Sequence, residues 1–300
     1  MTNLEQRLAN LSPEQRALLL RKINEQHVLA GRQGKHSRLQ PITALPRGQT
    51  FPLSFAQQRV WFLHQLGSGA AYNLPAMLKL SGRLDVAALQ QSLSEIIRRH
   101  ETLRTTFSTI DGETRQVIHE KNAVELPLIN LQHLLAEARE TSVKQLATDE
   151  ALRPFDLACD LMLRAKLLQL GPDEHVLLLT MHHIASDGWS LGILVGELTV
   201  LYAAFSHDKS APLPELPIQY ADFAVWQRQW LQGEILETQL SYWRDRLADA
   251  PQLLPFPTDR PRPSNQTFRG GLVPISVDAE LTRLLHQLSR RAEATLFMTL

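Results

Sequence analysis

Two adjacent histidines, His182 and His183, are the side chains of this sequence best suited to proton transfer. Histidine titrates near neutral pH, so an imidazole can accept or donate a proton under working conditions. Asp187 can shape the loop or orient an imidazole, and Gly188 leaves room for a ligand to approach. Spacing alone leaves open a proton-transfer site, a structural histidine pair and a metal site, although adjacent histidines rarely chelate one ion and no nearby Cys or Glu pattern completes a shell.

An apolar strand and a helix flank the histidine pair. The run 176–181 is too short for a core helix and follows a turn at 171–174, so we expect a buried strand. The apolar-periodic segment 191–205 predicts a helix, with Ser190 as its N-cap. Successive side chains of a strand point in opposite directions, so at most one imidazole is expected to face a substrate. The sequence therefore predicts reacting groups on a polar loop between two rigid elements.

Composition excludes several classes of protein. The 300 residues suffice for one or two domains, and 31 basic side chains balance 31 acidic ones. This balance provides no basic surface for nucleic acid or an anionic membrane. The single cysteine precludes an internal disulfide and fits a reducing compartment. No signal peptide is recognisable, and no apolar run reaches the ~18 residues of a membrane span, so we expect a soluble cytoplasmic protein.

The chain is predicted to divide into three parts. Residues 1–28 form an amphipathic helical extension that docks on the main domain, docks on a neighbouring protein or has no separate role. Residues 29–52 form a linker that contains three prolines and a small, solvated basic cluster. Residues 53–300 form the folded domain, and no cap, glycine or polar tail closes the end of its last apolar segment, at 296–300. We therefore expect this domain to be incomplete.

Several further elements are expected within the domain. A strand is predicted at 77–80, a helix capped by Asp85 follows it, and Asp111 with Gly112 marks a hairpin. Another helix is predicted at 141–153 and another strand at 161–170. Further along, the sequence indicates a single long helical stretch that carries three tryptophans, Trp226, Trp230 and Trp243. A last helix, capped by Asp278, is expected near the end.

Four segments carry a family resemblance when they are taken together. Residues 54–63 read SFAQQRVWFL and residues 99–107 read RHETLRTTF, which resemble the patterns SxAQxRxWxL and RHExLRTxF. Residues 182–188 read HHIASDG and residues 220–226 read YADFAVW, which resemble HHxxxDG and YxDFAxW. These are, in order, core motifs of the condensation domains of nonribosomal peptide synthetases, which are chloramphenicol-acetyltransferase-like acyltransferases. The resemblance covers roughly residues 50–300.

This resemblance implies a fold and a reaction. The fold is an α/β (α+β) sandwich, here the chloramphenicol-acetyltransferase-like N-terminal lobe plus the start of the second lobe; the family's active site lies between the lobes. The reaction joins a donor acyl or peptidyl thioester to an acceptor aminoacyl thioester, each held on the phosphopantetheine of a carrier domain, and forms an amide. Partners would be both carrier domains and the adenylation domain of the module. No metal or tightly bound cofactor is implied.

The resemblance also assigns roles to residues. His183 would accept the proton of the amine or position the amine as it attacks, and both remain open. His182 would support the loop. Asp187 would hold the loop's shape, through an arginine that is Arg59, Arg104 or a residue beyond 300.

The remaining roles concern the residues that follow Asp187. Gly188 would admit the pantetheine arm, and its backbone N–H is available to an oxyanion. Trp189 and Ser190 would support the motif. The intact His-His pair argues against heterocyclisation domains, which carry aspartates there. Ala185 and Ser186, just before Asp187, resemble the type that condenses an L-configured donor.

Three alternatives remain open. An epimerisation domain that acts on a carrier-bound peptide shares HHxxxDG. A non-catalytic docking or scaffold fragment is an alternative of a different class. An acetyltransferase that uses coenzyme A needs only HxxxD and leaves the other three motifs unexplained. We predict condensation chemistry for the parent protein and weak or no activity for these 300 residues alone.

Overall fold

The computed structural model describes residues 41–120, 124–253, 255, 257–261, 263, 270–271 and 273–300. The chain divides into two compact units, Met1–Ala250 and Pro251–Leu300. The predicted extension at 1–28 and the first part of the predicted linker, residues 29–40, lie outside the described residues.

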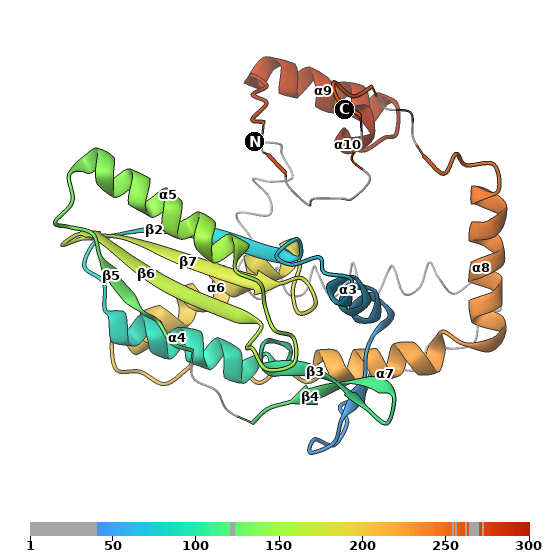
Figure 1. Ribbon diagram of the computed structural model, residues 1–300, viewed down its shortest axis with the longest axis horizontal. Helices are drawn as coiled ribbons and strands as arrows, with labels where there is room; N and C mark the ends of the chain where they lie inside the picture. The colour runs from blue at the N-terminus through green and yellow to red at the C-terminus, as the bar shows by residue number, and fades with distance from the viewer. Residues whose placement is uncertain are drawn as a thin grey trace. The chain divides into compact units, whose positions relative to one another are not determined.

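A four-stranded sheet forms the centre of the larger unit (Figure 1). Its strand order is β2 (Asn73–Ser81), β7 (Glu174–His182), β6 (Leu163–Gly171) and β5 (Leu128–Asn130). β7 pairs antiparallel with β2 and β6, whereas β5 pairs with β6 in parallel. β7 is buried on both faces, and its central residues Val176–Leu179 and Met181 are apolar. The strand predicted at 176–181 is confirmed.

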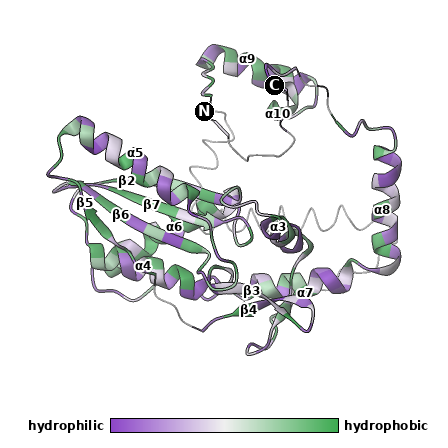
Figure 2. Cartoon of the chain, viewed as in Figure 1, coloured by the Kyte–Doolittle hydropathy of each residue, from purple (hydrophilic) through white to green (hydrophobic). Residues whose placement is uncertain are grey.

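Helices cover both faces of this sheet (Figure 1). α4 (Val86–Arg99) and α6 (Gly188–Phe205) pack on the face that carries Leu177, whereas α5 (Ala136–Leu152) packs on the face that carries Leu178. Consecutive strand residues thus enter different cores. Both colours alternate along α4 in Figure 2, as expected of a helix with one buried and one solvent-facing side.

Side-chain caps determine where the helices begin. Asp85 caps α4 by accepting a hydrogen bond from the Ala88 N–H at 2.9 Å, as predicted. Asp187, and not Ser190, caps α6: its carboxylate accepts from the Ser190 N–H at 2.8 Å. The Ser190 hydroxyl accepts in return from the Asp187 N–H at 3.2 Å. The prediction of Ser190 as N-cap was therefore wrong, because this reciprocal capping box starts the helix at Gly188.

Helix α6 also corrects an expectation about membrane spans. It has 18 residues and a mean hydropathy of 1.4, so its length and composition suffice to cross a membrane. No such run was predicted, because glycines, hydroxyl residues and Glu197 interrupt the apolar residues of this segment, although its mean hydropathy is high. Leu194, Leu198 and Leu201 pack in the core, so the fold itself accounts for the apolar side of α6.

A smaller antiparallel sheet has the order β1 (Phe51–Pro52), β4 (Glu113–Ile118) and β3 (Thr105–Ile110). The predicted hairpin joins β3 to β4, and Asp111 and Gly112 have φ of 52° and 81°. A two-residue turn of this hand requires positive φ at both positions. The single-turn helix η2 leads from α4 into β3 and spans Glu101–Arg104.

α7 (Tyr220–Trp230) packs beside β1. α3 (Phe55–Gln65) is joined to β4 by a hydrogen bond from the Gln57 side chain to the Gln116 side chain at 3.0 Å. The predicted long helical stretch from Trp226 to Trp243 is in fact two helices. α7 ends at Trp230, and α8 (Gly233–Leu247) begins at Gly233, whose φ of 56° interrupts the helical path.

The smaller unit contains α9 (Ala279–Arg291) and α10 (Leu296–Thr299). Asp278 caps α9 by accepting from the Leu281 N–H at 2.7 Å, as predicted.

The predicted linker differs from expectation at its described end. Phe51 is 2% exposed and lies opposite Gln116 in the smaller sheet. Arg47 forms ion pairs with two carboxylates of the larger unit. Contacts with the folded unit therefore begin before residue 53, because the Phe51 side chain is buried and Arg47 forms ion pairs with the larger unit. The division into parts at 28 and 52 otherwise stays a prediction.

Candidate active site

A cavity of about 560 Å³ in the larger unit is lined by all four motif segments. The first segment contributes Ala56, Gln57, Arg59 and Val60, the second His100 and Thr102, and the fourth Tyr220 and Phe223. The third contributes His183, Ile184, Ala185, Ser186 and Asp187, and Ser190, just after this segment, also lines the cavity. Segments far apart in the chain thus meet around one concave space, which is the usual setting of a ligand site.

His183 is the exposed member of the histidine pair and lies on the cavity wall. It follows the last residue of β7, and its backbone N–H donates to the Tyr72 carbonyl at 2.8 Å. The Tyr72 ring lies 6.3 Å from the imidazole, centroid to centroid. The end of the β2–β7 ladder therefore anchors the backbone of His183 while its side chain lines the cavity.

His182 has the opposite environment and is fully buried. Its ring packs against His64 and Phe155, with centroid distances of 5.8 and 5.6 Å. Burial first, and then the nearby cationic groups, lower the pKa of His182 to about 4. The Nδ1 atom accepts a hydrogen bond from the Ile184 N–H at 3.2 Å, so the proton of the neutral ring lies on Nε2.

The backbone of His182 also holds the histidine loop, residues 182–190. Its carbonyl oxygen accepts from the Ala185 N–H at 3.0 Å and from the Ser186 hydroxyl at 3.1 Å. These contacts give His182 a structural position at the start of the loop. Its supporting role in a reaction stays a prediction.

Asp187 is bound by its own helix. Besides the Ser190 N–H, the Ser190 hydroxyl donates to the carboxylate at 2.7 Å. Hydrogen bonds from Ser190 hold the pKa of Asp187 below its usual value, so the group is ionised at neutral pH. Within the described part of the chain, no ion pair joins Asp187 to an arginine.

The structure separates the two arginines that were considered as partners of Asp187. Arg59 is exposed and lines the same cavity as Asp187. Arg104 instead donates to the backbone carbonyls of His119 and Arg98, and it is absent from the cavity lining. Among the residues described, no three His, Cys, Asp or Glu side chains are grouped as metal ligands.

Gly188 and Trp189 form the first turn of α6. A Cβ atom built on Gly188 would meet nothing within 4 Å, so protein packing does not require glycine there. Trp189 is 82% exposed. Access of a ligand to Gly188 stays a prediction.

Sequence reasoning missed Glu197. Its carboxylate lies 2.7 Å from His100 Nε2 and accepts from Arg99 Nε at 3.0 Å. Burial opposes ionisation of Glu197, but these hydrogen bonds outweigh it and the pKa lies below its usual value. A signal existed, because Glu197 is the sole charged residue of α6.

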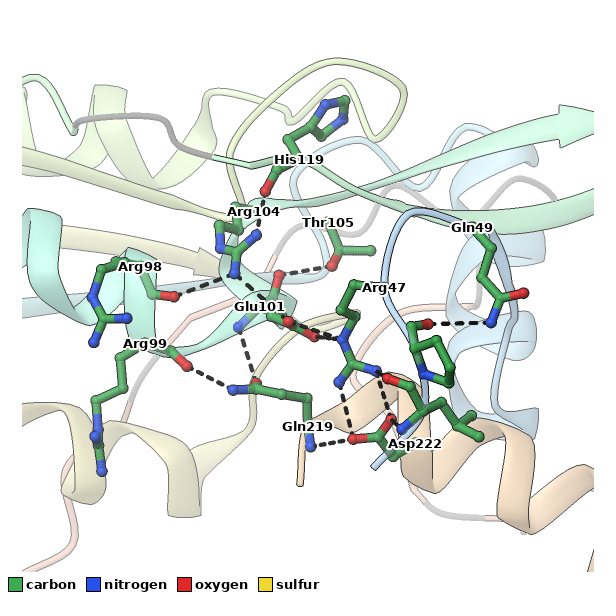
Figure 3. A network of polar contacts seen from close by, with 12 residues as sticks. Arg47, Gln49, Arg98, Arg99, Glu101, Arg104, Thr105, His119, Gln219 and Asp222 are labelled. Atoms are coloured by element: carbon green, nitrogen blue, oxygen red, sulfur yellow. Dashed lines mark hydrogen bonds and ion pairs between the residues drawn. The ribbon is translucent and has the colours of Figure 1, made fainter. Parts of the chain in front are cut away.

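Arg47 was also missed. Figure 3 shows its guanidinium between Asp222 and Glu101. It donates to Asp222 at 2.8 and 3.0 Å and to Glu101 at 3.0 and 2.9 Å. We call Arg47, Glu101, Gln219 and Asp222 the Arg47 clamp. It joins the chain before β1 to the second and fourth motif segments.

Gln219 completes the clamp. Its backbone N–H donates to Asp222 at 2.7 Å, its side-chain oxygen accepts from the Glu101 N–H at 3.1 Å, and its amide donates to the Arg99 carbonyl at 2.8 Å. The Asp222 side chain is fully buried, which favours its neutral form. Hydrogen bonds from Arg47 and two backbone amides outweigh this burial and lower the pKa of Asp222.

Comparison with known proteins places the chain in a family. Residues 48–300 match the model of the Condensation domain family. A linear gramicidin synthase of Brevibacillus parabrevis is 51% identical over 261 residues, which are 87% of this chain and 3% of that protein. Phosphinothricin tripeptide synthetase of Streptomyces viridochromogenes is 41% identical over 305 residues, covering 100% of this chain and 27% of that protein. The chain thus spans a small part of these relatives.

Solved structures agree on the fold. The X-domain from teicoplanin biosynthesis has a TM-score of 0.74 and 31% identity, over 85% of this chain and 56% of that one. The first condensation domain of the CDA synthetase has a TM-score of 0.65 and 21% identity, over 83% of this chain and 59% of that one. The predicted α/β fold of the chloramphenicol-acetyltransferase-like class is confirmed. With the family match and the synthetase relatives, the chain belongs to the condensation-domain family of nonribosomal peptide synthetases.

Proposed function

We propose that this domain forms an amide bond between a donor acyl or peptidyl thioester and an acceptor aminoacyl thioester, both held on phosphopantetheine arms of carrier domains. The observation that carries the proposal is the convergence of four motif segments on one cavity with His183 on its wall. The contrast with His182 supports the choice of residue. A buried ring with a pKa of about 4 has neither access to a substrate nor a proton affinity suited to neutral pH.

In the proposed reaction the acceptor amine attacks the donor carbonyl carbon. A C–N bond forms, the C–S bond to the donor arm breaks, and the amine loses one proton, which the departing thiolate finally takes up. His183 either accepts that proton in passing or holds the amine in line, and its exposed imidazole suits both. A positioned base contributes about 10²- to 10⁴-fold to such a rate.

The neighbouring residues take supporting roles in this proposal. The hydrogen bonds between Asp187 and Ser190 fix the loop that follows His183. Gly188 offers open space for a pantetheine arm, and its N–H at the first helical position is available to the oxyanion. Arg59 shares the cavity with both His183 and Asp187 and is the described arginine placed to meet a substrate or Asp187.

The proposal extends to partners and compartment. Donor and acceptor carrier domains and an adenylation domain would supply the substrates, which reach the cavity on their arms rather than on a cofactor resident in this domain. The synthetase relatives support such a multi-domain context. A cytoplasmic location is part of this proposal. We expect residues 1–300 alone to be weakly active or inactive.

The test uses the chain lengthened beyond residue 300 to the full length of the solved relatives. We would incubate it with loaded donor and acceptor carriers and detect the dipeptidyl thioester by intact mass. We expect product from the wild type, a loss of about 10²-fold or more in His183→Ala, and no loss in His133→Ala. His133 is a suitable control because it is exposed and lies outside the cavity lining.

Other outcomes would reassign the function. Product that persists in His183→Ala would show that another residue carries the reaction. Epimerised carrier-bound peptide without amide formation would identify an epimerisation domain. Equal turnover by residues 1–300 and by the lengthened chain would contradict the expected weakness of the shorter chain.

A docking function is the second candidate, because one solved relative is described in a protein complex. The X-domain from teicoplanin biosynthesis, in its complex with OxyB, has a TM-score of 0.75 and 32% identity to this chain. Here the exposed Trp189 beside the cavity would offer a contact surface. Failure of every substrate pair to react or epimerise would favour this docking role.

A further inference from the structure

We infer that residues 41–50, which we call the strap, form part of the active site: Ile42 supplies a wall of the His183 cavity, and Arg47 fixes that wall by binding Asp222 and Glu101. This goes beyond the expected role of these residues as a linker. It rests on the proposed function only for the identity of the substrate that meets the wall.

The strap borders the cavity directly. Ile42 is half-buried and lines the same cavity as His183 and Asp187. Leu216, Ile218 and Phe223 line it as well, and all three are apolar. The strap therefore contributes to an apolar region of a cavity that also carries an imidazole and a carboxylate, so this region suits an apolar part of an acyl thioester.

Several bonds hold the strap in place. Besides the four contacts of Arg47 with carboxylate oxygens, the Leu45 N–H donates to Asp222 at 3.0 Å. Arg47 also donates to the Leu45 carbonyl at 2.7 Å. Its guanidinium carbon lies 5.5 Å from the centre of the Phe51 ring. A solvated linker would need none of these contacts.

The anchors of the strap lie next to residues of the cavity wall. Glu101 and Asp222 belong to the second and fourth motif segments, both of which line the cavity at neighbouring residues. His100 and Thr102 flank Glu101, whereas Tyr220 and Phe223 lie beside Asp222. The clamp therefore fixes the strap to the same backbone that shapes the cavity (Figure 3). Arg47 is a positioning residue, and Ile42 determines specificity.

The strap is tested first without any reaction. In Arg47→Met we expect hydrogen exchange at the Leu45 amide to accelerate by about tenfold, because the strap opens more often. Arg115→Met is the matched control: the two arginine side chains are 31% and 34% exposed, and Arg115 forms an ion pair with the exposed Glu113. If exchange does not accelerate in Arg47→Met, or accelerates equally in the control, Arg47 does not hold the strap in place.

The wall is tested by binding of acyl thioesters to the lengthened chain. We expect Ile42→Ala to weaken hexanoyl-pantetheine by about fivefold and to leave acetyl-pantetheine unchanged, since only the longer chain reaches apolar surface. Ile42→Asp should weaken the hexanoyl thioester further. Equal effects on both thioesters, or no effect on either, would contradict the assignment of Ile42 to a wall that contacts the acyl chain.

Turnover separates this inference from the proposed function. If the wild type forms amide, Ile42→Ala should raise KM for donors or acceptors with large apolar side chains more than it lowers kcat. If the wild type forms no amide, the proposed function fails, yet the exchange and binding results still decide on the strap.

Discussion

The histidine loop and the Arg47 clamp border the same cavity but are held in different ways. In the loop, most hydrogen bonds join residues two to four positions apart, as from Ile184 to His182 and from Ser186 to His182, although the His183 N–H also donates to the distant Tyr72 carbonyl. In the clamp, Arg47 reaches Glu101, 54 residues away, and Asp222, 175 residues away. The loop therefore depends mainly on local contacts, whereas the clamp requires segments between residue 45 and α7 to be folded together.

Their electrostatics differ as well. The Asp187 carboxylate is exposed and is stabilised by one serine. The Asp222 carboxylate is fully buried and depends on a cation and on backbone amides. Removing a partner from a buried charge costs far more than removing one from an exposed charge. The clamp should therefore dominate stability and the loop should dominate chemistry.

The largest stability effect is expected for Arg47→Met. Loss of the guanidinium leaves Asp222 buried without its cation, which we expect to cost about 3 kcal/mol of unfolding free energy, at the low end for a buried pair because Arg47 is partly exposed. Arg115→Met should cost less than about 1 kcal/mol. Urea unfolding at pH 7 measures both. Equal losses would mean that the clamp contributes no more to stability than an exposed ion pair.

His182 provides a pH test of the loop. The folded state holds its pKa near 4 while the unfolded chain titrates near 6.5, so the unfolded state binds more protons between these values. The stability contributed by the neutral ring is complete above about pH 6.5 and is lost as pH falls towards 4.

The expected loss is about 2 kcal/mol between pH 6.5 and 4.5. Unfolding free energies of wild type and His182→Gln, measured across this range, isolate the contribution of His182 together with its interaction with the adjacent His64, because groups away from His182 cancel in the difference. Parallel curves for the two proteins would show that His182 is not held neutral by burial.

A smaller effect is expected at the start of α6. Asp187→Ala removes the N-cap and should cost about 1 kcal/mol. Ser190→Ala removes the other half of the capping box, and the double variant should cost less than the sum of the two. Thermal or urea unfolding of the three variants provides the measurement. Full additivity would mean that the two side chains act independently.

The smallest stability effect is expected for Gly188→Ala. A methyl group there meets only open space, so the unfolding free energy should change by less than about 0.5 kcal/mol. Turnover should nevertheless fall if a pantetheine arm approaches this residue. A variant with normal stability and normal turnover would exclude that approach.

The same contrast explains what the sequence could predict. The buried strand before His182 and the hairpin at Asp111 and Gly112 follow from local patterns, and both are present. Alternation along a strand predicted that one imidazole at most would face a substrate. Which one does depends on pairing with β2, through the bond from His183 to Tyr72, and local sequence does not specify that pairing.

The wrong predictions concern features that depend on particular contacts or backbone angles, which residue types alone do not specify. Ser190 and Asp187 are both good N-cap residues, and only their reciprocal bonds decide between them. The break before α8 depends on the left-handed backbone of Gly233. The strap was predicted to be a linker because the partners of Arg47 lie 54 and 175 residues away in the chain, and no local sequence pattern indicates these contacts.

The most direct measurement is chemical modification of the two histidines by diethyl pyrocarbonate in the lengthened chain, located by fragmentation mass spectrometry. We expect His183 to react at pH 7, His182 to stay unmodified, and an acyl-pantetheine thioester to slow the reaction of His183. Modification of His182 at a similar rate, or no protection of His183 by the thioester, would contradict the placement of His183 as the imidazole that meets the substrate.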